Sequence, residues 1–131
     1  MPDDNIHSSE QGRSGVVSVF TGQFASDEEL ELFVEIDYGT EDGDDITSPF
    51  LASTGIEWYD EDFAERSFWS AGTLVDRLRE HSYGERIDPT ALTDLAARQT
   101  DNSLYLIYDF DATGAYQGRL SLVGVYPYTK N

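Results

Sequence analysis

The chain lacks cysteine and has few positive charges. None of its 131 residues is cysteine, which excludes disulfides, thiol catalysis, cysteine-ligated zinc and iron–sulfur clusters. Only 8 residues are Lys or Arg against 26 Asp or Glu, and the formal net charge is −18. Nucleic acids and anionic membrane surfaces attract proteins through Lys and Arg, so this composition argues against both as partners.

Long hydrophobic runs are also missing. No apolar segment reaches the roughly 20 residues that span a bilayer. The first ten residues, MPDDNIHSSE, are polar and acidic, unlike a secretory signal peptide, so we expect a cytoplasmic protein. A chain of 131 residues that is 39% hydrophobic and 13% aromatic fits one globular domain.

The negative charge is concentrated in one stretch. Residues 14–65 carry 15 acids and no Lys or Arg, whereas residues 66–131 carry 8 acids and 7 bases. Such a concentration repels itself and weakens the folded state, and a cationic partner would relieve that repulsion. The alternative is a solvated acidic face that only aids solubility.

The N-terminal half predicts a tail, a strand and two helices. Residues 1–15 have almost no apolar side chains and predict a flexible tail before a single domain of residues 16–131. Residues 16–20 (VVSVF) predict a buried strand. A capping box at Ser26 and Glu29 predicts a helix over residues 27–35.

A second helix start lies at Ser48-Pro49, and Gly55 ends that helix. Residues 38–45 (YGTEDGDD) read as a loop, and residues 56–59 as a possible short strand.

The C-terminal half predicts two helices and two strands. One helix covers residues 73–81, with Leu74, Val75 and Leu78 inward, and another follows Asp88-Pro89, with Leu92, Leu95 and Ala96 inward. Strands at residues 103–110 and 116–126 predict a hairpin. The expected fold is therefore α+β: a mostly antiparallel sheet, made of the N-terminal strand and the C-terminal hairpin, with three to four helices packed on one face.

Catalytic signatures are absent from the sequence. It contains no nucleophile elbow, phosphate-binding loop or dinucleotide fingerprint. His81 falls at the predicted end of a helix, where a structural role is expected. Asp42-Gly43-Asp44-Asp45 resembles part of a calcium loop, but its twelfth position is Ser53 rather than Glu. We therefore expect no catalytic residue, metal or cofactor.

Aromatic and acidic side chains interleave between residues 57 and 69. Aromatic anchors rimmed by acids suit a basic protein partner, although buried aromatics more often belong to the core, and that alternative stays open. The candidate partner-binding residues come from this segment and from the acidic loop before it: Glu41, Asp42, Asp44, Asp45, Glu57, Trp58, Tyr59, Asp60, Glu61, Asp62 and Glu65.

Four segments together resemble the immunity protein 22 family of bacterial polymorphic-toxin systems. They are VSVFTGQFASDEEL (17–30), SPFLASTGIEWYDEDFAE (48–65), SLYLIYDF (103–110) and LSLVGVYPY (120–128). Phe20 stands where the family pattern often has Trp, which keeps an aromatic anchor. The resemblance implies an intracellular protein that binds and neutralises a cognate toxin domain, commonly a nuclease.

Two other functions remain open at this stage. One is a small acidic regulatory domain that binds another basic protein. The other is an enzyme that uses a pair of carboxylates, although nothing in the sequence selects such a pair. The sequence gives no oligomeric state.

Overall fold

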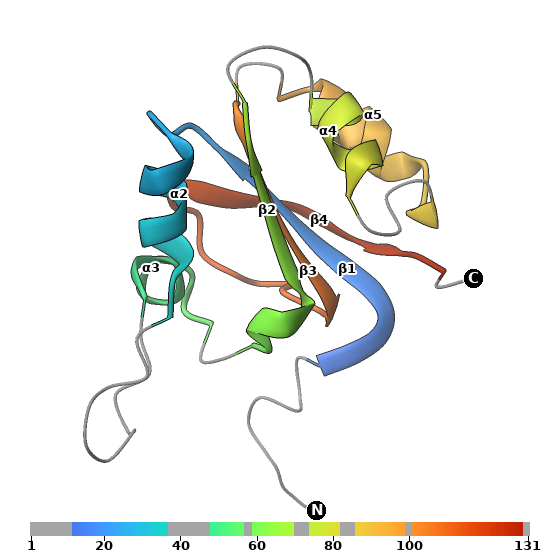
Figure 1. Ribbon diagram of the computed structural model, residues 1–131. Helices are drawn as coiled ribbons and strands as arrows, with labels where there is room; N and C mark the ends of the chain where they lie inside the picture. The colour runs from blue at the N-terminus through green and yellow to red at the C-terminus, as the bar shows by residue number, and fades with distance from the viewer. Residues whose placement is uncertain are drawn as a thin grey trace, which may run out of the picture.

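The computed structural model describes residues 12–36, 48–56, 59–69, 74–81, 86–98 and 101–129. Within these ranges, four antiparallel strands form one sheet in the order β2-β3-β1-β4. The strands are β1 (Gly12–Gly22), β2 (Ala64–Phe68), β3 (Ser103–Phe110) and β4 (Leu120–Pro127). The predicted α+β fold around an antiparallel sheet is confirmed (Figure 1).

The predicted C-terminal hairpin is wrong, because β1 lies between β3 and β4. Both strands pair antiparallel with β1, so they run parallel to each other and cannot be joined by a tight hairpin turn. The connecting residues 111–119 instead pass beside α3 (Pro49–Thr54), where the Tyr116 N–H donates to the carbonyl of Thr54 at 2.9 Å. The strand predicted to begin at residue 116 therefore begins at Leu120.

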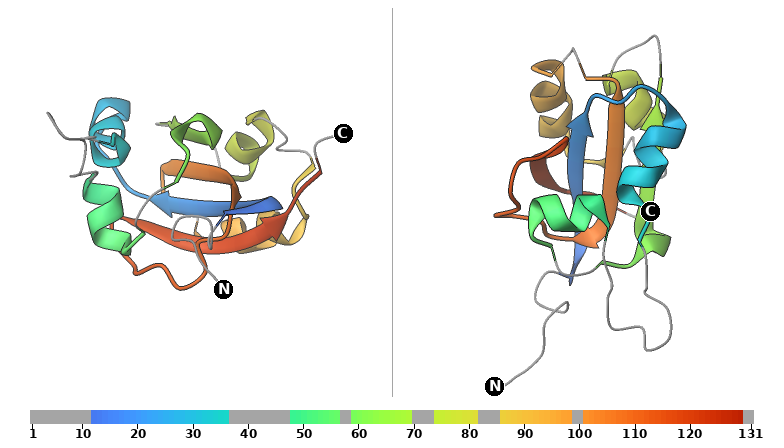
Figure 2. Two further views of the ribbon diagram at one scale, coloured as in Figure 1. Left: turned by 90° about the horizontal axis from the view of Figure 1, so that it is seen from below. Right: turned by 90° about the vertical axis from the view of Figure 1, so that its left-hand side faces the viewer.

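The expected packing of the helices on one face is also corrected, because helices cover both faces of the sheet (Figures 1 and 2). α2 (Asp27–Val34) and α3 pack on one face, and α4 (Leu74–Glu80) and α5 (Thr90–Ala96) pack on the other. The sequence of β3, SLYLIYDF, explains this arrangement. Successive side chains of a strand point to opposite faces, and here both sets are largely apolar, so each face needs its own cover.

The core under α2 and α3 is aromatic. Phe50 of α3 lies at its centre, with ring centroids 4.9 Å from Phe20, 5.3 Å from Tyr105 and 5.8 Å from Tyr59, all in edge-to-face geometry. Edge-to-face pairs add about 0.5–1.5 kcal/mol each beyond the burial of their area. The core under α4 and α5 is more aliphatic and includes Val17, Val19, Leu78, Leu95, Leu104 and Leu106.

Both predicted N-terminal helices are confirmed, together with their caps. The Ser26 hydroxyl accepts from the N–H of Glu29 at 3.1 Å, and the Glu29 carboxylate accepts from the N–H of Ala25 at 2.9 Å. The Ser48 hydroxyl caps α3 by accepting from the N–H of Leu51 at 2.9 Å. These local contacts explain why sequence signals located both helices.

The C-terminal helices are also present, with one change of inner face. The Asp88 carboxylate accepts from the N–H of Thr90 at 2.9 Å, which satisfies one free donor at the start of α5. Leu95 and Ala91 are the buried residues of α5, whereas Leu92 is half-buried and Ala96 is exposed. In α4, Leu78 is buried as predicted, and the side chains of residues 74 and 75 lie outside the described part.

Strand β1 begins at Gly12, four residues before the predicted Val16. Gly15 has a φ of 86°, and the pairing register with β3 shifts between Gly12 and Val17. This irregular start hides the strand from a pattern search, because glycine and polar residues interrupt the alternation. The predicted tail therefore loses residues 12–15 to the strand, and residues 1–11 lie outside the described ranges.

Strand β2 was not predicted. Its sequence, AERSF, is short and polar, and it offers no alternation that marks a strand. The possible strand at residues 56–59 is not present at Ile56 or Tyr59, and residues 57 and 58 lie outside the described ranges.

Candidate functional site

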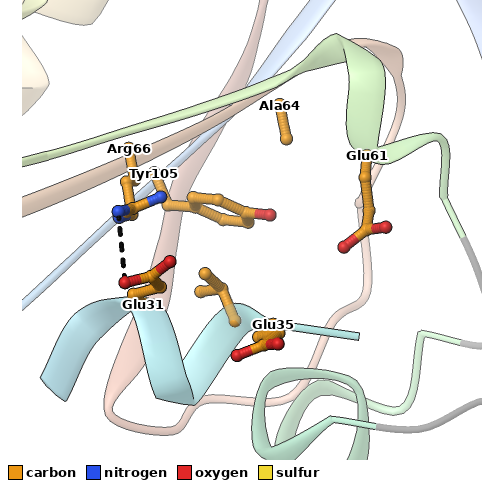
Figure 3. Close-up of a pocket in the computed structure, with 7 residues that line it drawn as sticks. Glu31, Glu35, Glu61, Ala64, Arg66 and Tyr105 are labelled. Carbon is orange, nitrogen blue, oxygen red and sulfur yellow. Dashed lines mark ion pairs between the residues drawn. The ribbon is translucent and has the colours of Figure 1, made fainter. Parts of the chain in front are cut away.

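An acidic pocket of about 240 Å³ opens between α2 and the β2 edge of the sheet (Figure 3). Figure 3 shows carboxylates reaching it from two elements, with an aromatic ring between them. Seven residues line it: Glu31, Val34 and Glu35 from α2 and its C-cap, Glu61 from the turn η1 (Glu61–Phe63), Ala64 and Arg66 from β2, and Tyr105 from β3.

Helical spacing places the α2 acids toward β2. Asp27, Glu31 and Glu35 are four residues apart, so they fall on one side of the helix. Leu30 and Val34, on the adjoining side, are buried against the aromatic core. Burial of this apolar stripe therefore fixes the direction in which the three carboxylates project.

The turn η1 presents Glu61 to the pocket. The Asp60 carboxylate accepts from the N–H of Asp62 at 3.0 Å, and the N–H of Phe63 donates to the carbonyl of Asp60 at 3.0 Å. These contacts close a tight turn that leaves Asp60 and Asp62 exposed. A Glu61 carboxylate oxygen accepts from the N–H of Ile36 at 3.4 Å, which joins the turn to the end of α2.

Arg66 is the one base among the lining residues. Its guanidinium lies 3.3 Å from the Asp27 carboxylate and 3.6 Å from that of Glu31. Glu35 forms no ion pair within the described part of the chain. Three glutamates and one arginine give the lining a formal net charge of −2. The pocket therefore suits a cationic group better than an anionic one.

The base of the pocket is buried and aromatic. Tyr105 is buried, and its hydroxyl shares a hydrogen bond of 2.5 Å with the hydroxyl of Tyr59. Both rings also pack edge-to-face with Phe50 of the core. The carboxylates are thus held over a packed layer rather than over a flexible loop.

The structure brings together only some of the predicted partner-binding residues. Asp60, Glu61 and Asp62 lie together at η1, with Asp60 as its N-cap. The Tyr59 side chain is only 1% exposed and packs in the core, so it presents no surface to a partner. Glu65 projects from the other face of β2 and meets His81. Six predicted residues lie outside the described ranges: Glu41, Asp42, Asp44, Asp45, Glu57 and Trp58.

Sequence reasoning identified only Glu61 among the seven pocket residues, and it missed four that carry a charge or an aromatic ring: Glu31, Glu35, Arg66 and Tyr105. The spacing of Asp27, Glu31 and Glu35 was a usable signal for two of them. No comparable signal marked Arg66, because β2 itself was not predicted. Tyr105 lies on a predicted strand, but nothing in its pattern distinguishes a pocket residue from a core residue. Among the aromatic residues of this segment that the structure describes, Phe63 is the exposed one, at 48%, beside the η1 acids.

We define the acidic surface as the α2 and η1 carboxylates around the pocket: Asp27, Glu31, Glu35, Asp60, Glu61 and Asp62. Within the described ranges, no three His, Asp or Glu side chains gather closely enough to hold a metal ion. The helices described are also too short or too polar to cross a membrane.

Comparison with known protein families identifies the family of the chain. Residues 17–129 match the model of a protein family described as Immunity protein 22. No curated protein and no solved structure matches the chain.

Proposed function

The chain belongs to the Immunity protein 22 family, and from this premise we propose that it binds a cognate toxin domain and thereby neutralises it. Binding is stoichiometric, takes place in the cytoplasm and involves neither catalysis nor a cofactor. The acidic surface is the proposed docking face, with Phe63 as its aromatic contact. The acidic pocket is the observation that supports this choice, because it gathers carboxylates over a buried aromatic base.

The proposed toxin domain is cationic, and a nuclease is the class of toxin that we propose. A nuclease binds the phosphates of its substrate with Lys and Arg, so its cleft carries positive charge. Carboxylates docked there occupy the positions that phosphates otherwise take, and access to the cleft is lost. The remaining acids of the same stretch, at residues 41–45 and 57, are proposed as further contacts, together with Trp58.

Long-range attraction supports fast capture. Opposite charges on two proteins steer their encounter and raise the association rate, and salt screens that effect. The acidic surface has six carboxylates and one nearby arginine, so it keeps an excess of negative charge that can attract a cationic partner. Speed matters for an immunity protein, because a free toxin acts until it is bound.

The test uses the toxin domain encoded by the gene adjacent to this one. Coexpression should restore growth, and the two purified proteins should form a one-to-one complex. In Asp60→Lys/Asp62→Lys, association at low salt should slow by about tenfold, and high salt should shrink the difference. Both side chains are exposed, but Asp60→Lys also removes the hydrogen bond from the Asp62 N–H that closes η1, so circular dichroism and a melting curve check that the fold persists.

The matched control is Asp76→Lys/Glu80→Lys on α4, which changes the net charge equally. These two exposed residues lie on the other side of the sheet. If both double variants slow association equally, only net charge matters and the acidic surface is not the docking face. If the toxin domain forms no complex with the wild-type chain, the neutralisation proposal itself is wrong.

A further inference from the structure

Strand β2 forms an edge of the sheet. Its neighbour on one side is β3, and no strand of the described ranges pairs with its other side. The opposite edge, β4, is partly covered at its end. There the N–H of Asp88 donates to the carbonyl of Pro127 at 2.9 Å, and the N–H of Thr129 donates to the carbonyl of Arg86 at 3.2 Å. Within the described ranges, the β4 edge is therefore partly covered by backbone hydrogen bonds, whereas the β2 edge has no strand beside it.

The phase of the β2–β3 ladder shows which backbone groups point outward. The N–H of Trp69 donates to the carbonyl of Asn102 directly opposite, at 3.2 Å. In an antiparallel pair, hydrogen-bonded and non-hydrogen-bonded positions alternate. Ser67 and Glu65 therefore bond to β3, and the N–H and C=O groups of Arg66 and Phe68 point away from it.

These outward groups have no partner within the described ranges. At the start of the strand, the N–H of Ala64 donates to the carbonyl of Glu61. The N–H and C=O groups of Arg66 and Phe68 form no hydrogen bond on the free side with any residue that the structure describes. Unpaired edge groups of this kind are a template for another strand. They are spaced to pair with about two to three residues of an incoming chain.

The acidic pocket lies on one face of this edge. Ala64 and Arg66 line the pocket, so the side chains of these residues share its face of the sheet. A strand added beside β2 would lie about 4.8 Å away, with every second side chain on that same face. One such side chain is then placed directly over the pocket, within reach of Glu35 and Glu61 (Figure 3).

The charge around β2 indicates which kind of strand can pair with its free edge. Acids flank β2 on both faces, with Asp27 and Glu31 on the α2 side and Glu65 on the side of α4. A second copy of this chain would bring two molecules of net charge −18 into contact at these acidic flanks, which like-charge repulsion opposes. A strand carrying Lys or Arg is attracted instead.

We propose that the free edge of β2 pairs with an extended, Lys- or Arg-bearing segment of the toxin domain, and that one of its basic side chains enters the acidic pocket. This rests on the proposed function and deepens it. Main-chain hydrogen bonds at Arg66 and Phe68 align the segment, and the pocket selects a cationic side chain at one position. The toxin segment then becomes an additional strand of the sheet, next to β2.

The first experiment measures amide exchange by NMR, with and without the toxin domain encoded by the adjacent gene. The Arg66 and Phe68 amides should exchange at least about tenfold more slowly in the complex, because new hydrogen bonds protect them. The Ser67 amide, already bonded to β3, is the internal control and should change much less. Unchanged exchange at Arg66 and Phe68 in a formed complex overturns edge pairing and leaves neutralisation intact.

The second experiment compares Arg66→Pro with Arg66→Ala. Both remove the guanidinium, but only proline removes the outward N–H, and proline is tolerated at such edge positions. The affinity of Arg66→Pro for the toxin domain should be about tenfold weaker than that of Arg66→Ala. Equal affinities count against the strand pairing.

Three further outcomes are decisive. If the wild-type chain forms a dimer in light scattering and its Arg66 amide is protected without toxin, the occupant is a second copy and the proposal is wrong. Absence of any complex with the toxin domain contradicts the proposed function rather than the edge alone. A Glu35→Gln/Glu61→Gln variant that binds as tightly as wild type overturns the role of the pocket.

Discussion

The Nδ1 atom of His81 lies 2.8 Å from a carboxylate oxygen of Glu65. This contact ties the end of α4 to strand β2. In the described part of the sheet, β3 is the one strand that pairs with β2. The imidazole is largely buried, at 11% exposed, while Glu65 is half-buried. The sequence predicted a structural role for His81 at a helix end, and the geometry gives that role a partner on β2.

His81→Ala should therefore lower stability without abolishing neutralisation of the toxin. Loss of a part-buried hydrogen bond to a carboxylate costs about 1–2 kcal/mol. A chain of this size should then melt about 4–8 °C lower. Thermal unfolding measures the first effect, and growth rescue by coexpression measures the second. Loss of rescue with the fold and expression intact would revive an acid–base role for His81.

The N-terminal boundary of the domain can be tested by two deletions. Removing residues 1–11 should leave the melting temperature nearly unchanged, because these residues have few apolar side chains to anchor them. Removing residues 1–15 should lower it by about 4 °C or more. The longer deletion removes the Arg13–Asp111 ion pair at 3.1 Å and the hydrogen bond of 2.9 Å from the Gly15 N–H to Asp109. Equal melting temperatures would show that residues 12–15 contribute nothing.

Asp111 provides a test of pH dependence. Hydrogen bonds from Thr113 and, to a lesser degree, the Arg13 guanidinium lower the pKa of its carboxyl below the ordinary value of 3.8. A lowered folded-state pKa contributes stability above the unfolded pKa, and that stability is lost as pH falls through the folded one. Asp111→Asn keeps an oxygen for the Thr113 N–H and removes the charge.

The wild type should melt about 2 °C above Asp111→Asn at neutral pH, a gap typical of an exposed ion pair. The gap should hold down to about pH 4 and close below it. Melting curves from neutral to acidic pH measure it. A gap that widens on acidification contradicts the assigned pKa direction.

The sequence predicts the helices of this fold better than its sheet. The caps at Ser26 and Ser48 act over three residues, so the signals for α2 and α3 are local and readable. The order of β3, β1 and β4 depends on contacts between residues about a hundred positions apart. A hairpin was the default for two successive strands, and only the pairing of β1 with both overturns it.

The candidate site was partly predictable for the same reason. Asp60, Glu61 and Asp62 are adjacent in the chain, so composition found them. The pocket forms only when β2 lies against α2, and the polar sequence of β2 hid that contact. Tyr59 shows the limit of reading aromatics among acids. Its neighbours in sequence are charged, but its ring packs against Phe50 and Tyr105 in the core.

Phe63 supplies the sharpest test of the docking face at a single residue. Its side chain is 48% exposed on η1, between the acids at 60–62 and the edge strand. Aromatic side chains near the centre of an interface often contribute 2 kcal/mol or more, and their truncation raises the dissociation rate. Phe63→Ala should therefore weaken toxin binding by about thirtyfold, mainly through faster dissociation.

The matched control is Tyr116→Ala, which truncates an aromatic that is 70% exposed beside α3 rather than on the acidic surface. That variant should bind the toxin domain as the wild type does. Because Phe63 is about half exposed and Tyr116 is mostly exposed, neither variant should lose more than about 1 kcal/mol of stability. Surface plasmon resonance against the toxin domain of the adjacent gene measures the rates. Equal dissociation rates for Phe63→Ala and the wild type would remove η1 from the docking face, because a truncated central aromatic cannot leave an interface unchanged.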